Sequence, residues 1–115
     1  QIIKILDTNP HIIVDGTLTH FSDADNQDDS YTNKQCICFE SCITKFKQAG
    51  ISPQWIHTSN SASLVKIKSE LVNTSRAGIA LYGLNPLEAN DPCYEQYQSL
   101  QPVLRVGKSG LLQKI

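Results

Sequence analysis

The sequence contains no methionine and little charge, and its apolar runs are short. Only 18% of its residues are charged, and 10 Lys and Arg against 11 Asp and Glu leave a net charge of -1. No basic face is therefore available to neutralise phosphates, which excludes charge-driven binding of nucleic acid. The apolar runs are too short to cross a bilayer, so we expect no membrane span in this segment. The 40% share of hydrophobic residues is nevertheless typical of a folded protein.

The two ends of the sequence predict an internal segment of a longer polypeptide. No initiator methionine is present, and the apolar residues at 2–6, before a turn at 7–10, are typical of the end of an amphipathic helix. The other end, at 111–115, closes on an apolar residue without a cap or a polar tail. The alternative is a small domain whose disordered ends have been trimmed.

Three of the four cysteines, Cys36, Cys38 and Cys42, lie close together, whereas Cys93 stands apart. A zinc site would favour a Cys-x-x-Cys pair with a second pair or two histidines at a suitable distance. The C-x-C-x-x-x-C spacing falls instead in a predicted helix, on which Cys36 lies well round from Cys38. We therefore predict three small buried thiols in a reducing cytosol, and no metal site.

Apolar periodicity and turn residues predict alternating strands and helices, followed by β structure. The expected elements are a strand at 12–21, a helix at 31–49 ended by Gly50, a strand at 54–58, a helix at 59–67, a strand at 75–82, an irregular stretch at 85–99, and antiparallel β structure at 100–115 that turns through Gly107 and Gly110. The alternation is typical of an α/β fold with a parallel sheet and crossover helices. Because the last part breaks this alternation, we place a domain boundary near Gln98, between residues 1–98 and 99–115.

Two segments combine features that suit an anionic ligand. Residues 56–62 run from a predicted strand into a helix N-terminus, where unpaired backbone N–H groups and the Ser61 hydroxyl could donate hydrogen bonds. In residues 76–83, Arg76 offers a planar, permanently charged fork, and Gly78 allows the backbone to approach a ligand closely. Taken singly, the first pattern also fits a plain helix cap, and the second also fits a surface ion pair.

Three stretches occur in an order that carries more information than any one of them. They are Thr-His-Phe-Ser-Asp-Ala-Asp at 19–25, Asn-Ser-Ala at 60–62, and Arg-Ala-Gly-Ile-Ala-Leu-Tyr-Gly-Leu-Asn-Pro at 76–86. Together they resemble successive signatures of alanine racemase, and residues 100–106 are similar to that family's entry into its C-terminal β-domain. The resemblance implies the later part of a (β/α)8 TIM-type barrel, with pyridoxal phosphate at its C-terminal strand ends, followed by the first strands of a C-terminal β-domain.

The resemblance also implies which residues bind the cofactor. They are His20, Asn60, Ser61, Arg76, Gly78 and Ile79. Ser61 and the backbone N–H groups of Gly78 and Ile79 would hold the phosphate. Arg76 would face the pyridine nitrogen, and His20 would orient Arg76. An arginine can donate a hydrogen bond to that nitrogen but cannot deliver a proton to it, because a guanidinium does not deprotonate in proteins.

The activity implied by the resemblance is the interconversion of L- and D-alanine, in the cytoplasm, by a homodimer with shared active sites. In the family the Schiff-base lysine lies before the position of Gln1, and the tyrosine base, which serves the partner subunit, lies after that of Ile115. We therefore expect no catalytic residue within this segment, and no activity of the segment alone. Three alternatives stay open: a related serine racemase, a non-catalytic pyridoxal-phosphate-binding barrel protein, and a small βα domain without a ligand.

Overall fold

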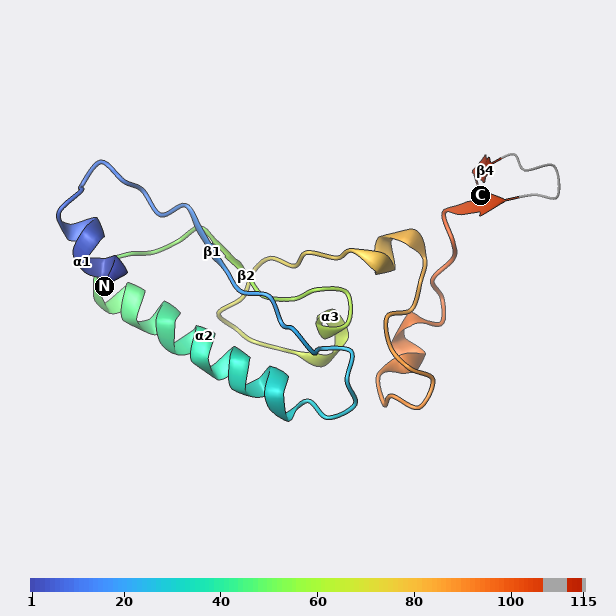
Figure 1. Ribbon diagram of the computed structural model, residues 1–115. Helices are drawn as coiled ribbons and strands as arrows, with labels where there is room; N and C mark the ends of the chain where they lie inside the picture. The colour runs from blue at the N-terminus through green and yellow to red at the C-terminus, as the bar shows by residue number, and fades with distance from the viewer. Residues whose placement is uncertain (107–111, 115) are drawn as a thin grey trace.

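A computed structural model describes residues 1–106 and 112–114 of the chain (Figure 1). In chain order its elements are α1 (Ile2–Asp7), β1 (Gly16–Leu18), α2 (Ser30–Gln48), β2 (Trp55–His57), α3 (Ser63–Lys66), the 3-10 helices η1 (Ile79–Tyr82) and η2 (Tyr94–Tyr97), β3 (Leu104–Val106) and β4 (Leu112–Lys114). The architecture is mixed α/β, as the sequence predicted, and α1 confirms the helix expected at the start of the chain.

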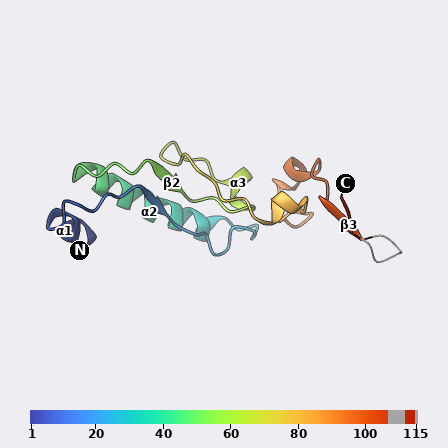
Figure 2. The ribbon, with the colours of Figure 1, turned by 90° about the horizontal axis from the view of Figure 1, so that it is seen from above.

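The centre of the structure is a β-α-β unit. Strands β1 and β2 pair in parallel, with Thr17 opposite Ile56. Helix α2 connects the two strands and runs alongside them in both ribbon views (Figure 1, Figure 2). A parallel bridge from His57 to Thr74 places a third extended segment beside β2. The predicted parallel pairing with a crossover helix is therefore present.

Helix α2 is amphipathic and has a defined C-terminal cap. Its buried residues recur three or four positions apart on one face, and they are Thr32, Cys36, Phe39 and Ile43. Gly50 adopts the left-handed conformation with φ 74°, which a residue without a Cβ reaches most easily. The N–H of Ile51 then donates to the carbonyl of Phe46 at 2.9 Å and closes a Schellman motif. Gly50 therefore ends the helix, as the sequence predicted.

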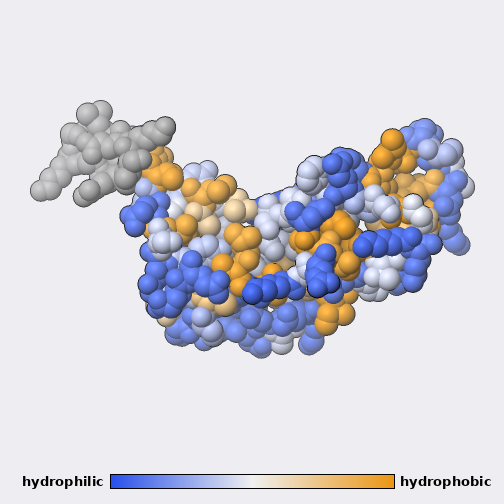
Figure 3. Space-filling view, turned by 180° about the vertical axis from the view of Figure 1, so that it is seen from behind, coloured by the Kyte–Doolittle hydropathy of each residue, from blue (hydrophilic) through white to orange (hydrophobic). Residues whose placement is uncertain are grey.

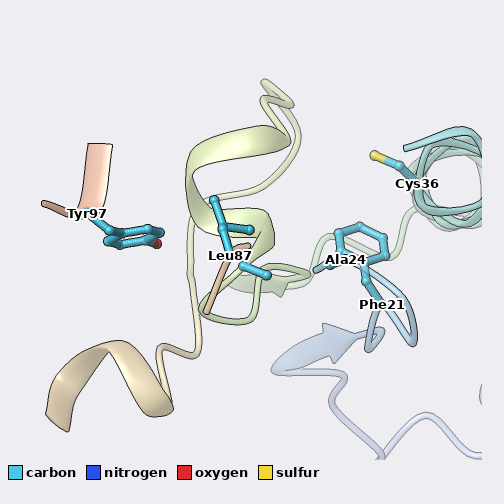
Figure 4. Close-up of a cluster of buried hydrophobic side chains, with 6 residues drawn as sticks. Phe21, Ala24, Cys36, Leu87 and Tyr97 are labelled. Atoms are coloured by element: carbon cyan, nitrogen blue, oxygen red, sulfur yellow. The ribbon is translucent and has the colours of Figure 1, made fainter. Parts of the chain in front are cut away.

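Two small apolar clusters form the core. The first joins α2 to β2 through Phe39, Ile43 and Ile56. The second, which we call the central cluster, gathers side chains from segments far apart in the sequence: Phe21, Ala24, Cys36, Ala62, Leu87 and Tyr97. In Figure 4, Cys36 lies at one end of the central cluster and Tyr97 at the other. The segment after residue 86 is thus packed onto the β-α-β unit through its side chains.

The described chain is elongated and leaves apolar surface uncovered. It measures 61 × 32 × 19 Å and has a radius of gyration of 18.4 Å, whereas a compact domain of this length would have about 13 Å. Large apolar side chains such as Ile13 and Leu81 are mostly exposed, and apolar patches are visible on the face shown in Figure 3. Uncovered apolar residues on an elongated chain are typical of one part of a larger domain.

The prediction of a strand at 75–82 was wrong. Residues Ile79–Tyr82 form η1, and the extended backbone at this place is limited to the bridge at Thr74. The physical reason is the direction of the amides, because the N–H groups of Gly78 and Ala80 turn toward the Ser61 hydroxyl instead of toward a neighbouring strand.

Two other predicted elements are shorter than expected. The strand predicted at 12–21 is reduced to Gly16–Leu18, because β2 pairs with only this part of it. The helix predicted at 59–67 is reduced to Ser63–Lys66. Hydrogen bonds between Asn60 and Ser63 hold a turn in front of that helix.

The prediction of three buried thiols was wrong for two of them. Cys36 is buried, but Cys38 and Cys42 are exposed on α2. A helix turns only one face inward, and here that face carries Cys36 together with Phe39 and Ile43. Within residues 1–106 and 112–114, no three metal-ligating side chains gather at one place.

Strands β3 and β4 pair antiparallel, with Arg105 opposite Gln113, which confirms β structure after residue 100. The turn predicted through Gly107 and Gly110 lies outside the described residues. Before these strands, the stretch expected to be irregular contains η2 alone as a regular element. None of the helices in the described part is long and apolar enough to span a membrane.

Candidate functional site

The carboxyl ends of three neighbouring extended segments meet at one edge of the structure. His20 follows β1, Asn60 follows β2, and Arg76 follows the bridge at Thr74. Because parallel segments end at the same edge, these residues lie close together. A cleft of about 380 Å³ opens here, and its walls are His20, Asp25, Asn60, Ser61, Ala62, Arg76, Gly78, Ile79 and Pro86. All the residues that the resemblance assigned to the cofactor therefore line one cleft.

Ser61 is a buried residue of the cleft whose hydroxyl is held by hydrogen bonds. It is only 5% exposed. Its Oγ accepts hydrogen bonds from the backbone N–H of Gly78 at 2.8 Å and of Ala80 at 3.2 Å. A hydroxyl oxygen has two acceptor lone pairs, and both are used by these amides. The remaining capacity of the Ser61 hydroxyl is to donate its own proton.

Arg76 is anchored through both its backbone and its side chain. Its backbone N–H donates to the Ser59 carbonyl at 2.8 Å. Its Nη2 donates to the Thr19 carbonyl at 2.9 Å and lies 3.3 Å from Nδ1 of His20. Since a guanidinium only donates, Nδ1 of His20 accepts and the ring proton of His20 is assigned to Nε2. The other terminal nitrogen, Nη1 of Arg76, is buried and has no hydrogen-bond partner among the described residues.

Asn60 lines the cleft, but its polar atoms are used by the scaffold. Its Nδ2 donates to the Phe21 carbonyl at 3.1 Å. Its Oδ1 accepts from the N–H of Ser63 at 3.0 Å, and the Ser63 Oγ accepts from the N–H of Asn60, also at 3.0 Å. This reciprocal arrangement caps the turn that leads into α3. Asn60 therefore ties the end of β1 to the start of α3.

A largely buried ionic group lies outside the walls of the cleft. The Nζ of Lys66, whose side chain is 2% exposed, lies 3.2 Å from Oδ1 of Asp29 and 2.6 Å from Oδ2 of Asp91. Burial disfavours the charge of Lys66, but hydrogen bonds with Asp91 and Asp29 outweigh burial and raise its pKa. Burial likewise opposes the charge of Asp91, but the hydrogen bonds from Lys66 and from the Cys93 N–H, together with the charge of Lys66, outweigh it and lower the pKa of Asp91. The group ties α3 to the loop before α2 and to the segment before η2.

Sequence reasoning missed several residues of this region. Asp25 and Pro86 line the cleft and stand inside the stretches that carry the resemblance, so their position was a usable signal. Tyr97 contacts Ser61 through a hydrogen bond from its hydroxyl to the Ser61 carbonyl at 2.6 Å. No motif marks Tyr97, because it lies in a stretch without periodicity.

Known proteins match the part of the chain that contains the cleft residues. The sequence profile of the family described as "Alanine racemase, N-terminal domain" matches residues 1–86. The chain belongs to the alanine racemase family. The curated alanine racemase of Methanococcus maripaludis is 36% identical over 104 residues, which are 90% of this chain and 27% of that protein. The alanine racemase of Lactobacillus acidophilus is 40% identical over 90 residues, 72% of this chain and 21% of that protein.

Solved alanine racemases share the fold. The enzyme from Bacillus anthracis with bound L-Ala-P superposes with a TM-score of 0.68 at 32% identity, over 87% of this chain and 25% of that chain. Alanine racemase from Clostridium difficile 630 gives a TM-score of 0.73 at 33% identity, over 88% of this chain and 27% of that chain. Another structure of that protein is a complex with cycloserine. This chain spans about a quarter of the length of the alanine racemases that it matches.

Proposed function

We propose that residues 1–98 form the later part of a (β/α)8 TIM-type barrel and that residues 99–115 begin the C-terminal β-domain of an alanine racemase. The parallel pairing of β1 with β2, the crossover helix α2 and the further parallel bridge at Thr74 support the first part. The antiparallel pairing of β3 with β4 supports the second. Active sites of such barrels lie at the carboxyl ends of the strands, where the cleft is found.

We also propose that the cleft binds pyridoxal phosphate. At one side, the Ser61 hydroxyl has both lone pairs occupied and only its proton to offer, which suits a phosphate oxygen. Ile79 is the first residue of η1, where a backbone N–H has no acceptor within its own helix. At the other side, the buried Nη1 of Arg76 needs an acceptor. The donors present therefore fit a ligand with an anionic end and an acceptor nitrogen in a ring.

The residues of this chain would then hold and orient the cofactor. When bound, pyridoxal phosphate supplies a conjugated ring that withdraws electron density from the Cα of an amino acid. Arg76 donates a hydrogen bond to the ring nitrogen and keeps its own proton, because a guanidinium stays protonated in proteins. His20 accepts from Nη2 of Arg76 and so fixes the plane of that guanidinium. Ser61 and the N–H of Ile79 would hold the phosphate end, because the N–H groups of Gly78 and Ala80, on either side of Ile79, donate to the Ser61 Oγ.

The remaining parts of the proposed enzyme lie outside this chain. We propose a cytoplasmic homodimer with shared active sites, in which the Schiff-base lysine and the tyrosine base come from other segments and act from opposite faces of Cα. All four cysteines of the chain are unbonded, which supports a reducing compartment. The substrate proposed is alanine.

The convergence of Ser61, Arg76 and His20 on one cleft carries the proposal. It is tested by assaying the full-length protein for conversion of L-alanine into D-alanine by chiral chromatography, together with the absorbance of bound cofactor. We expect both signals. Faster conversion of serine than of alanine would favour a related serine racemase. Bound cofactor without conversion of either amino acid would favour a non-catalytic barrel protein, and absence of both signals would refute the proposal.

A further inference from the structure

Tyr97, the last residue of η2, reaches the edge of the cleft with its hydroxyl. Its side chain is 7% exposed and belongs to the central cluster, together with Leu87 (Figure 4). Its hydroxyl donates to the Ser61 carbonyl at 2.6 Å. Burial raises the pKa of Tyr97, so that the hydroxyl keeps its proton and remains a donor at neutral pH.

Ser61 is therefore fixed from two directions. Its carbonyl is held by Tyr97 from the side of the central cluster, and its Oγ is held by the amides of Gly78 and Ala80 from the side of η1. These contacts fix both the peptide plane and the side-chain rotamer. The proton of the hydroxyl then has one open direction, and no acceptor for it is found among residues 1–106 and 112–114.

We infer that Tyr97 is a positioning residue for the anion-binding hydroxyl of Ser61. This inference rests on the proposed binding of pyridoxal phosphate in the cleft. Without the Tyr97 hydroxyl, the buried Ser61 carbonyl loses its hydrogen-bond donor, and one of the contacts that fix the peptide after Ser61 is removed. The Ser61 hydroxyl then no longer points permanently at the phosphate position, so the contribution of the phosphate to binding falls.

The test compares two probes on the full-length protein. Pyridoxal phosphate and pyridoxal differ only in the phosphate. The dissociation constant of pyridoxal divided by that of pyridoxal phosphate therefore measures the contribution of the phosphate contact. For Tyr97→Phe we expect that ratio to shrink about tenfold, the effect of losing one well-oriented hydrogen bond. The affinity for pyridoxal should stay unchanged. Tyr94→Phe is the matched control, because Tyr94 also packs on the central cluster and uses its backbone, not its hydroxyl, to bond Asn85.

A double variant makes the inference sharper. If Tyr97 acts through Ser61, then Tyr97→Phe should leave the ratio unchanged in a Ser61→Ala background. An unchanged ratio in the single Tyr97→Phe variant would overturn the inference. So would an equal loss for both probes with a lower Tm, because that is the signature of a purely structural role. A parent protein that binds both probes equally well would refute the proposed function instead, so the two failures can be told apart.

Discussion

Replacing Arg76 by lysine tests whether the guanidinium fork, rather than its charge, serves the cleft. In the structure, Nη2 donates to the Thr19 carbonyl and to Nδ1 of His20, while Nη1 is buried without a partner in the described part of the chain. A lysine keeps the positive charge but offers it at a single point. One ammonium group cannot occupy the positions of both terminal nitrogens, so either the anchoring or the ligand contact is lost.

The size of the effect follows from the contacts at stake. A hydrogen bond to a charged group contributes about 1.5–3 kcal/mol, and the loss of one donor to a ligand would therefore weaken binding about 10- to 150-fold. The contact with His20, at 3.3 Å, is at the long end of the hydrogen-bond range. We thus expect Arg76→Lys to lower the free energy of unfolding by only about 1–2 kcal/mol, and its main effect to be on binding.

Two measurements on the full-length protein separate these effects. Titration of the cofactor-free protein with pyridoxal phosphate gives the dissociation constant, and denaturant unfolding without ligand gives the stability. Lys68→Ala is the control, since Lys68 is an exposed cation outside the walls of the cleft. If Arg76→Lys lowers stability but leaves the affinity for pyridoxal phosphate unchanged, Arg76 is only a scaffold residue and the reasoning fails.

Four further predictions concern the stability of the protein or of this segment. Asp91→Asn should lower Tm at neutral pH and make Tm less sensitive to acid. Because the pKa of Asp91 is lowered, its pairing with Lys66 stabilises the fold above the ordinary carboxyl pKa of 3.8, and this stabilisation is lost as the pH falls through the folded-state pKa. Measuring Tm against pH for both proteins checks this prediction. Gly83→Ala should unfold the protein or nearly so, because at φ +79° a Cβ would overlap the Gln101 carbonyl. Gly50→Ala, at a similar φ of +74° but in open space, should cost about 1–2 kcal/mol by denaturant titration. Finally, residues 1–115 alone should be inactive and poorly stable, given the uncovered apolar side chains, and cooperative unfolding of a soluble monomer of this segment would contradict that expectation.

Elements with local causes could be predicted from the sequence. The end of α2 depends on Gly50 and on bonds within the last turn, so the pattern around Gly50 was sufficient. The prediction of a strand at 75–82 failed because the conformation of this segment depends on a residue far away in the sequence. The amides of Gly78 and Ala80 are drawn away by Ser61, which is 17 and 19 positions earlier in the chain. Periodicity within a window cannot report a competitor that lies outside the window.

The candidate site divides in the same way. Local features suggested Ser61 and Arg76, because Ser61 stands at a predicted helix N-terminus and Arg76 offers a charged, planar fork two residues before Gly78. The division of labour among the residues was not accessible from the pattern. Asn60 occurs in the same short stretch as Ser61, yet its side chain is used by the turn before α3, while that of Ser61 faces the amides of η1. Tyr97 supports Ser61 through a hydrogen bond to the Ser61 backbone carbonyl. A backbone carbonyl is present at every position of a chain. Contacts to the backbone leave no mark on the type of residue contacted, so a supporting residue of this kind can be found only in three dimensions.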